Sequence, residues 1–86
     1  MTFVRTDAFV RDFQDLSNDL QRRAEEALRR FASDPRHPSL RVKKMEPKSR
    51  GIFELRVTKS CRITFETGHN DVRLRRIGAH NILRTP

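Results

Sequence analysis

Arginine residues recur through the stretch 51–80, and they are the side chains of this sequence best suited to bind an anion. Arginine carries a permanent charge and presents a planar set of donors that matches a phosphate group. If the segments of this stretch pair as strands, Arg56, Arg62 and Arg75 share one polar face. Like charges on neighbouring strands destabilise a sheet, so this row calls for an anion. The alternative is that these long side chains splay into water.

Two residues near the arginines could move protons. Histidine titrates near neutral pH, so His80 could give or take a proton. A carboxylate beside arginines is a weak base, which favours an electrostatic role for Glu54. The simpler interpretations are that Glu54 partly neutralises the arginines and that His80 caps a carbonyl. His37 and His69 are scattered along the chain and, with a lone Cys61, form no metal-ligand pattern, so we expect no metal and no cofactor.

The elements that must position these residues are strands, because apolar residues occur at every second position. Pairing apolar with apolar residues sets Phe53 opposite Phe65 across a loop at 58–60. For the next hairpin, a turn at Gly68-His69 sets Phe65 opposite Val72 and Arg62 beside Arg75.

The alternation breaks at 76–77, where we expect a bulge or a twist. The last strand should therefore end near Gly78, shortly before His80. Residues 1–5 are expected to form an edge strand, 35–38 a rigid proline linker and 40–45 a further strand.

The segment 7–33 is expected to be helical, because its apolar residues recur at helical spacing. One unbroken helix would be about 40 Å long, whereas a domain of this size has a radius of gyration of about 12 Å. We therefore expect a break at Ser17–Asp19 and two antiparallel helices, the first capped by Thr6. The predicted fold is an α+β domain spanning 1–86, with a helical hairpin on one face of a twisted antiparallel sheet. Cys61 falls on the apolar face and is expected in the core.

The charge balance points to an anionic partner. The 86 residues include 19 Lys and Arg against 11 Asp and Glu, a formal net charge of +8. A nucleic acid is the simplest partner of such a chain, and an acidic protein is the second possibility. No apolar run reaches the length of a membrane span, and the first residues lack the core of a signal peptide. We therefore expect a cytoplasmic protein without a membrane partner.

In their order and spacing, the segments HPSLRVKKM, GIFELRV, CRITFE and IGAHNIL make the chain resemble the RelE/ParE superfamily of bacterial type II toxins, in particular the RelE branch. The resemblance covers nearly the whole chain and implies the same fold. It also implies cleavage of mRNA, often on the ribosome, by attack of a ribose 2′-OH on the adjacent phosphate, and control by a cognate antitoxin. An acidic or amphipathic segment of that antitoxin would lie across the basic sheet and helices.

The resemblance also implies roles for individual residues. Arg62 takes the place of the phosphate-stabilising arginine, and His80 that of a residue facing the scissile phosphate. Glu54 and Arg56 fall where some members have paired lysines, one of them proposed as the general base. Glu46 matches a glutamate that other members use as the base. We expect the surrounding RNA contacts to come from Lys43, Lys44, Arg73 and Arg75.

One departure from the family matters for function. Many members present a C-terminal tyrosine or another aromatic residue, whereas this sequence has no Tyr and no Trp and reads Leu83-Arg84-Thr85-Pro86. This puts catalytic strength or RNA docking in question. Two alternatives therefore stay open beside the ribonuclease: a ParE-like poison of DNA gyrase without catalysis, and an inactive member that binds RNA or an antitoxin.

Overall fold

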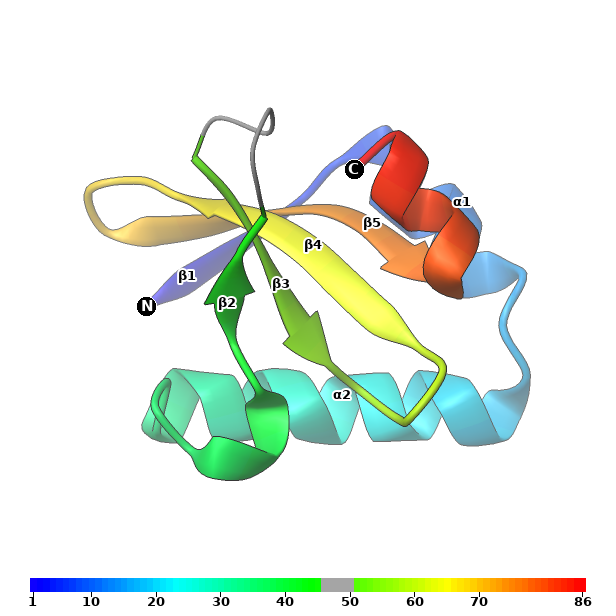
Figure 1. Cartoon of the computed structure of the whole chain (residues 1–86), viewed down its shortest axis with the longest axis horizontal. Coiled ribbons are helices and arrows are strands. Elements are labelled where there is room, and N and C mark those ends of the chain that lie inside the picture. The colour runs from blue at the N-terminus through cyan, green and yellow to red at the C-terminus, as the bar shows by residue number, and fades with distance from the viewer. Residues whose placement is uncertain (46–50) are drawn as a thin grey trace.

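A computed structural model of the chain describes residues 1–45 and 51–86. Within these residues, five strands form one sheet in the order β1-β5-β4-β3-β2, and two helices pack on one of its faces (Figure 1). In chain order the elements are β1 (Thr2–Arg5), α1 (Asp7–Gln14), α2 (Asn18–Ser33), η1 (Pro38–Leu40), β2 (Lys43–Lys44), β3 (Ile52–Arg56), β4 (Arg62–Thr67), β5 (Asp71–Gly78) and η2 (His80–Arg84). The predicted α+β architecture is confirmed, and the sheet is antiparallel except for β1, which pairs with β5 in parallel.

Two side-chain caps start the helices where the sequence predicts. The Thr6 hydroxyl accepts a hydrogen bond from the Phe9 amide at 3.2 Å, and the Ser17 hydroxyl accepts one from the Leu20 amide at 3.2 Å. Each cap satisfies an amide that the first helical turn leaves free. The predicted break between the helices is therefore confirmed. The apolar stripe of α2 enters the core through Ala24, Ala27, Leu28 and Phe31.

The core lies between α2 and the apolar face of the sheet. Except at one irregularity in β5, it receives one apolar side chain from every second strand position, as the pleat requires. Cys61 is 3% exposed, which confirms its predicted place in the core. The buried apolar residues of the strands are Leu55, Ile63, Phe65, Val72, Leu74 and Ile77. Among the residues that the structure describes, no helix is long and apolar enough to cross a membrane.

The first hairpin has the predicted register. Phe53 lies opposite Phe65, and the Val57 amide donates to the Cys61 carbonyl at 2.9 Å across the loop 58–60. Arg56 and Arg62 are cross-strand partners, as predicted.

The predicted register of the second hairpin is wrong. Phe65 pairs with Leu74 rather than with Val72, which lies opposite Thr67. The Gly68 amide donates to the Asp71 carbonyl at 2.8 Å, so the tight turn is at 69–70 instead of 68–69. From Phe65 to the turn the shift amounts to two residues, which leaves the side chains of β5 up to Leu74 on their predicted face. Apolar matching alone therefore could not distinguish the two registers.

A bulge in β5 corrects a second expectation. The register shifts between Thr64 and Phe65, whose partners are Arg76 and Leu74, so Arg75 is the extra residue. A bulge there is needed because Leu74 and Ile77 are both buried, although three positions apart. The sequence predicts it close to this point. Arg62 consequently lies opposite Gly78, and the predicted contact between Arg62 and Arg75 is wrong.

The segment 40–45 also differs from prediction. Leu40 belongs to η1 and is buried, and only Lys43–Lys44 form a strand. His37 caps η1 by accepting the Ser39 amide at 3.2 Å on Nδ1. The cap and the prolines favour a compact turn over an extended segment here.

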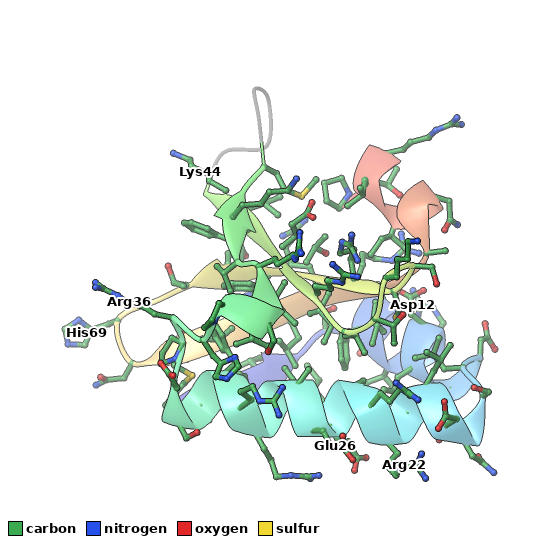
Figure 2. All side chains as sticks on the ribbon, turned by 60° about the horizontal axis from the view of Figure 1, so that its bottom comes forward. Asp12, Arg22, Glu26, Arg36, Lys44 and His69 are labelled. Atoms are coloured by element: carbon green, nitrogen blue, oxygen red, sulfur yellow. The ribbon has the colours of Figure 1, made fainter. Side chains whose placement is uncertain are left out.

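Helix α1 covers the edge of β5 beyond the end of β1. Asp12 accepts two hydrogen bonds from the Arg76 guanidinium, at 2.6 and 3.0 Å, and one from the Ile77 amide at 3.1 Å. Figure 2 shows Asp12 at this end of the sheet. The hydrogen bond that Arg76 donates to Asp12 is the main cause that raises the pKa of Arg76. Asp12 thus accepts from a strand amide on the side of β5 where the pairing with β1 has already ended.

Replacing Asp12 by Asn should lower the free energy of unfolding by about 1–3 kcal/mol, because it removes a part-buried, charge-assisted pair. Asp19→Asn is the matched control, since Asp19 also contacts two arginines, but on a side of α2 where these side chains are 54% to 65% exposed. We expect about 0–1 kcal/mol for it. Both free energies of unfolding can be measured by urea unfolding followed by far-UV circular dichroism. This signal is used because the sequence has no Trp or Tyr to serve as a fluorescent probe. Equal losses would contradict the importance of the Asp12 contacts.

Burial raises the pKa of the Cys61 thiol, and the nearby Arg62 opposes this to a smaller extent. Since the thiol pKa is higher in the folded chain, its contribution to stability is complete below the unfolded value of about 8.5 and is lost as the pH rises through the folded value. We expect the free energy of unfolding to fall between pH 7.5 and pH 10, and to fall less in Cys61→Ala. Parallel curves for the two proteins would exclude this linkage.

Candidate functional site

The candidate site lies on the polar face of the sheet and is centred on a buried carboxylate. Glu54 stands in the middle of β3, opposite Lys43 on one side and Thr64 on the other. It is only 6% exposed. Its Oε1 lies 3.5 Å from Nε of Arg62 and 4.0 Å from Nζ of Lys43. A buried carboxylate needs such partners, so Glu54 holds two cationic side chains at the centre of this face.

Arg62 is fixed by the hairpin loop as well as by Glu54. Its Nη1 donates to the carbonyls of Thr58 at 2.7 Å and Lys59 at 3.1 Å. The side chain is 23% exposed. A guanidinium has five N–H groups, so these contacts fix its plane without using all of its donors. Arg62 is therefore held in one orientation, as a group that stabilises charge in a transition state should be.

A shallow hollow of about 400 Å³ adjoins Glu54. Its lining comes from β2 and the residue that follows it, from β3 and from η2, and Figure 2 shows Lys44 on the side of the molecule away from α2. The ammonium groups of Lys43 and Lys44 border the hollow, and Glu54 supplies a carboxylate. Met45 and Leu83 supply apolar surface. Such a hollow suits an anionic ligand with an apolar part. The lining residues are Lys43, Lys44, Met45, Glu54 and Leu83.

The structure divides the predicted arginine row. Arg56 borders a second crevice of about 190 Å³, which is also lined by Arg23, Glu26 and Arg30 of α2. Arg75 lies near Glu66, with Nη1 3.4 Å from Oε1, and Nε of Arg73 lies 3.6 Å from the same oxygen. The two arginines predicted to bind RNA from β5 are therefore partly neutralised by one carboxylate. The predicted residues that the structure does bring together are Lys43, Lys44, Glu54 and Arg62.

The structure does not describe the side chains of two predicted site residues, Glu46 and His80. Glu46 lies outside the described residues. His80 begins η2, two residues after β5 ends, and its side chain is outside the described part of the structure. In the parts that are described, no group of three His, Cys, Asp or Glu side chains could hold a metal ion.

Sequence reasoning missed two polar residues on or beside this face. Thr64 is fully buried, although it lies on the polar side of β4. Arg76 joins α1 to the C-terminal segment, because it contacts Asp12 and also donates to the Thr85 carbonyl and hydroxyl at 3.3 and 3.1 Å. The break in alternation at 76–77 was the available signal for Arg76. Nothing in the sequence indicated that a distant segment would cover Thr64.

The arrangement of these elements is the fold of a class of small bacterial toxins. YafQ from E. coli strain BL21(DE3) matches it with a TM-score of 0.79 at 10% identity, over 94% of each chain. A YoeB/ParE toxin from Agrobacterium tumefaciens matches with 0.76 at 15% identity, over 93% of this chain and 99% of that one. The YoeB dimer from Staphylococcus aureus gives 0.73 at 13% identity, over 93% and 97%. No protein-family model and no curated protein matches the sequence.

At these low identities the TM-scores and the coverage establish the fold alone, and the RelE/ParE-like fold expected from the sequence is confirmed. One of the similar structures is YafQ in the E. coli DinJ-YafQ toxin-antitoxin complex, with a TM-score of 0.79. The roles of individual residues in this chain rest on its own geometry.

A double-mutant cycle should reveal coupling between Glu54 and Arg62. With Glu54→Gln, Arg62→Gln and the double variant, we expect a coupling free energy of about 0.5–2 kcal/mol, because either single change leaves a charge that has lost its partner. Glu66 with Arg73 is the matched control pair at a similar separation, but its side chains are 37% and 56% exposed. It should show at most about 0.5 kcal/mol. Similar coupling in both cycles would mean that burial gives the Glu54 pair no special strength.

Proposed function

We propose that this chain is the toxin of a toxin–antitoxin module and a metal-independent endoribonuclease that cleaves mRNA, in association with the ribosome. The observation that carries the proposal is the buried Glu54 on the polar face, with Arg62 and Lys43 beside it at the edge of an open hollow. The toxin fold and the formal net charge of +8 support it. The family resemblance supplies the reaction, in which a ribose 2′-OH attacks the adjacent phosphate.

The site residues fit the needs of that reaction. Arg62, held by Glu54 and by loop carbonyls, would stabilise charge on the phosphoryl oxygens. Lys43 and Lys44 would hold the RNA backbone at the hollow. His80, at the start of η2, would protonate the leaving 5′-oxygen. A carboxylate would accept the 2′-OH proton, and Glu54 and Glu46 are the two candidates for this step.

The proposed partners follow from charge and from the fold. A basic polar face suits mRNA and the RNA of the ribosome. An acidic or amphipathic segment of a cognate antitoxin would bind across the same face and the helices. One similar structure, YafQ, is in a complex with DinJ that is described as toxin-antitoxin. We place the protein in the cytoplasm, where mRNA and ribosomes are found.

One observation favours a second candidate, a toxin that binds its target without catalysis, such as a gyrase poison. Four arginines of this face and its edge already lie near carboxylates. Arg62 lies near Glu54 and Arg76 near Asp12, while Arg73 and Arg75 share Glu66. Internal neutralisation of this kind lowers the positive potential that phosphoryl transfer needs. A binding surface for a protein tolerates it better.

Expression of the chain without an antitoxin should arrest growth, and Arg62→Ala and His80→Ala should each relieve the arrest, because each removes a group proposed to act on the phosphate. We expect each change to lower mRNA cleavage at least about a hundredfold. Primer extension on mRNA after induction measures cleavage directly. Glu46→Gln distinguishes the two candidate bases: a similar loss of cleavage would assign the base to Glu46, and full cleavage would assign it to Glu54. Glu54→Gln should lower cleavage in either case, because it also removes a partner of Arg62.

Arg36→Ala is the control, because Arg36 lies in the loop that leads to η1, at the end of the molecule where Figure 2 also shows His69. It should remain toxic. Intact mRNA together with blocked replication, or full toxicity of both the Arg62 and the His80 variants, would exclude the ribonuclease and favour a gyrase poison.

A further inference from the structure

Two donors from neighbouring strands converge on one oxygen atom of the C-terminal segment. The Thr64 hydroxyl donates to the Pro86 oxygen at 3.1 Å, and Nε of Arg75 donates to the same oxygen at 3.0 Å. Thr64 is fully buried and Arg75 is held from its other side by Glu66, 3.4 Å from Nη1. We propose that Thr64 and Arg75 form a subsite for a phosphate oxygen of the RNA backbone, and that the chain's own Pro86 oxygen occupies it in this structure.

The bulge in β5 creates this subsite. Arg75 is the extra residue of the bulge and has no cross-strand partner, while its neighbours Leu74 and Arg76 pair with Phe65 and Thr64. Bulges redirect side chains, and this one turns Arg75 toward Thr64 on the polar face. A neutral hydroxyl and a guanidinium then point at one position. Two convergent donors of this kind, one of them charged, match an anionic oxygen.

The neighbouring contacts extend the same pattern. Nη1 of Arg76 donates to the Thr85 carbonyl at 3.3 Å, so successive oxygens of the C-terminal segment lie against successive arginines of β5. The segment therefore takes a path that a phosphodiester backbone could follow across this face. The candidate site around Glu54 adjoins it, because Glu54 is the cross-strand partner of Thr64. A backbone held at Thr64 and Arg75 would thus run directly past Glu54 and Arg62.

This inference rests on the proposed RNA substrate, but it concerns binding rather than cleavage. The probe is a fluorescent 2′-O-methyl RNA hexamer, which cannot be cleaved because its nucleophile is blocked. Fluorescence anisotropy titrations at several salt concentrations give the affinity and its salt dependence. Loss of the cleavage activity proposed above would leave this experiment unaffected, so the two proposals can fail separately.

The two donors should have different signatures. Arg75→Gln should weaken binding about tenfold and should reduce the slope of log affinity against log salt by about 0.7, the value for one phosphate contact on a single strand. Thr64→Val should weaken binding about fivefold with the slope unchanged, because the hydroxyl is neutral. Arg22→Gln is the matched control, since it removes the same charge from the outer side of α2, where Figure 2 shows Arg22. It should leave the slope unchanged.

A second variant at position 64 separates loss of the hydroxyl from loss of the fold. Thr64→Ser keeps the hydroxyl and should bind within about twofold of the original chain, and circular dichroism checks that each variant is folded. Unchanged binding by folded Thr64→Val, or an unchanged salt slope for Arg75→Gln, would overturn the subsite. Displacement of the RNA by millimolar inorganic phosphate in the original chain, but not in Thr64→Val, would show that free phosphate is the ligand and would overturn the assignment to RNA.

Discussion

The break in the alternation of β5 is the constraint on which the functional face depends. Leu74 and Ile77 must both reach the core, although they are three residues apart, and this is possible only with a bulge. Neighbouring residues of a regular strand point to opposite faces of the sheet, but at the bulge Arg75 and Arg76 both lie against the C-terminal segment. Arg76 then meets Asp12 of α1 and Thr85 of the C-terminal segment, while Arg75 meets Glu66 and Pro86. One apolar requirement thus decides how a helix, a strand and the C-terminal segment come together.

Charge pairing within the polar face decides what this surface can bind. Glu54 and Glu66 each lie against two basic side chains, so the face is an alternating pattern rather than a uniform positive patch. Exposed pairs of this kind contribute little to stability and exchange partners readily, because water screens them. The pair of Glu54 with Arg62 differs, since Glu54 is buried. An incoming phosphate can therefore compete for Arg73 and Arg75 more easily than it can reorganise Arg62.

Much of the fold could be predicted from the sequence because it follows from short-range periodicity. The caps at Thr6 and Ser17 and the pairing of Phe53 with Phe65 depend on residues close in sequence, and all three are confirmed. The second hairpin shows the limit of this reasoning. A two-residue shift leaves the faces unchanged, so hydrophobic pattern cannot detect it. The position of Gly68 predicted a turn at 68–69, whereas the turn lies at 69–70. One glycine therefore does not fix the position of a turn.

The candidate site could be predicted only in part, because its members meet through long-range packing. Glu54 and Arg62 lie on adjacent strands, so the predicted register of the first hairpin placed them near each other, as they are in the structure. Lys43 and Leu83 reach the same hollow from β2 and η2, whose positions no periodicity specifies. The cover over Thr64 comes from Pro86, 22 residues away. From sequence alone, a polar residue on the polar face of a strand is predicted to be exposed, because the segment that covers it is not known.

The absence of Tyr and Trp has a consequence for how this surface could hold RNA. Phenylalanines, the remaining aromatic residues of the sequence, are committed to packing: Phe53 stacks on Phe65, which in turn contacts Phe31. The hollow beside Glu54 offers Met45 and Leu83 instead. Aliphatic side chains lack the stacking that gives about 1–3 kcal/mol per base on aromatic platforms. Binding here would therefore depend mainly on phosphate contacts, and its affinity would fall steeply with salt. A ribosome, which presents RNA at high local concentration, would compensate for weak base contacts better than any change in the hollow itself.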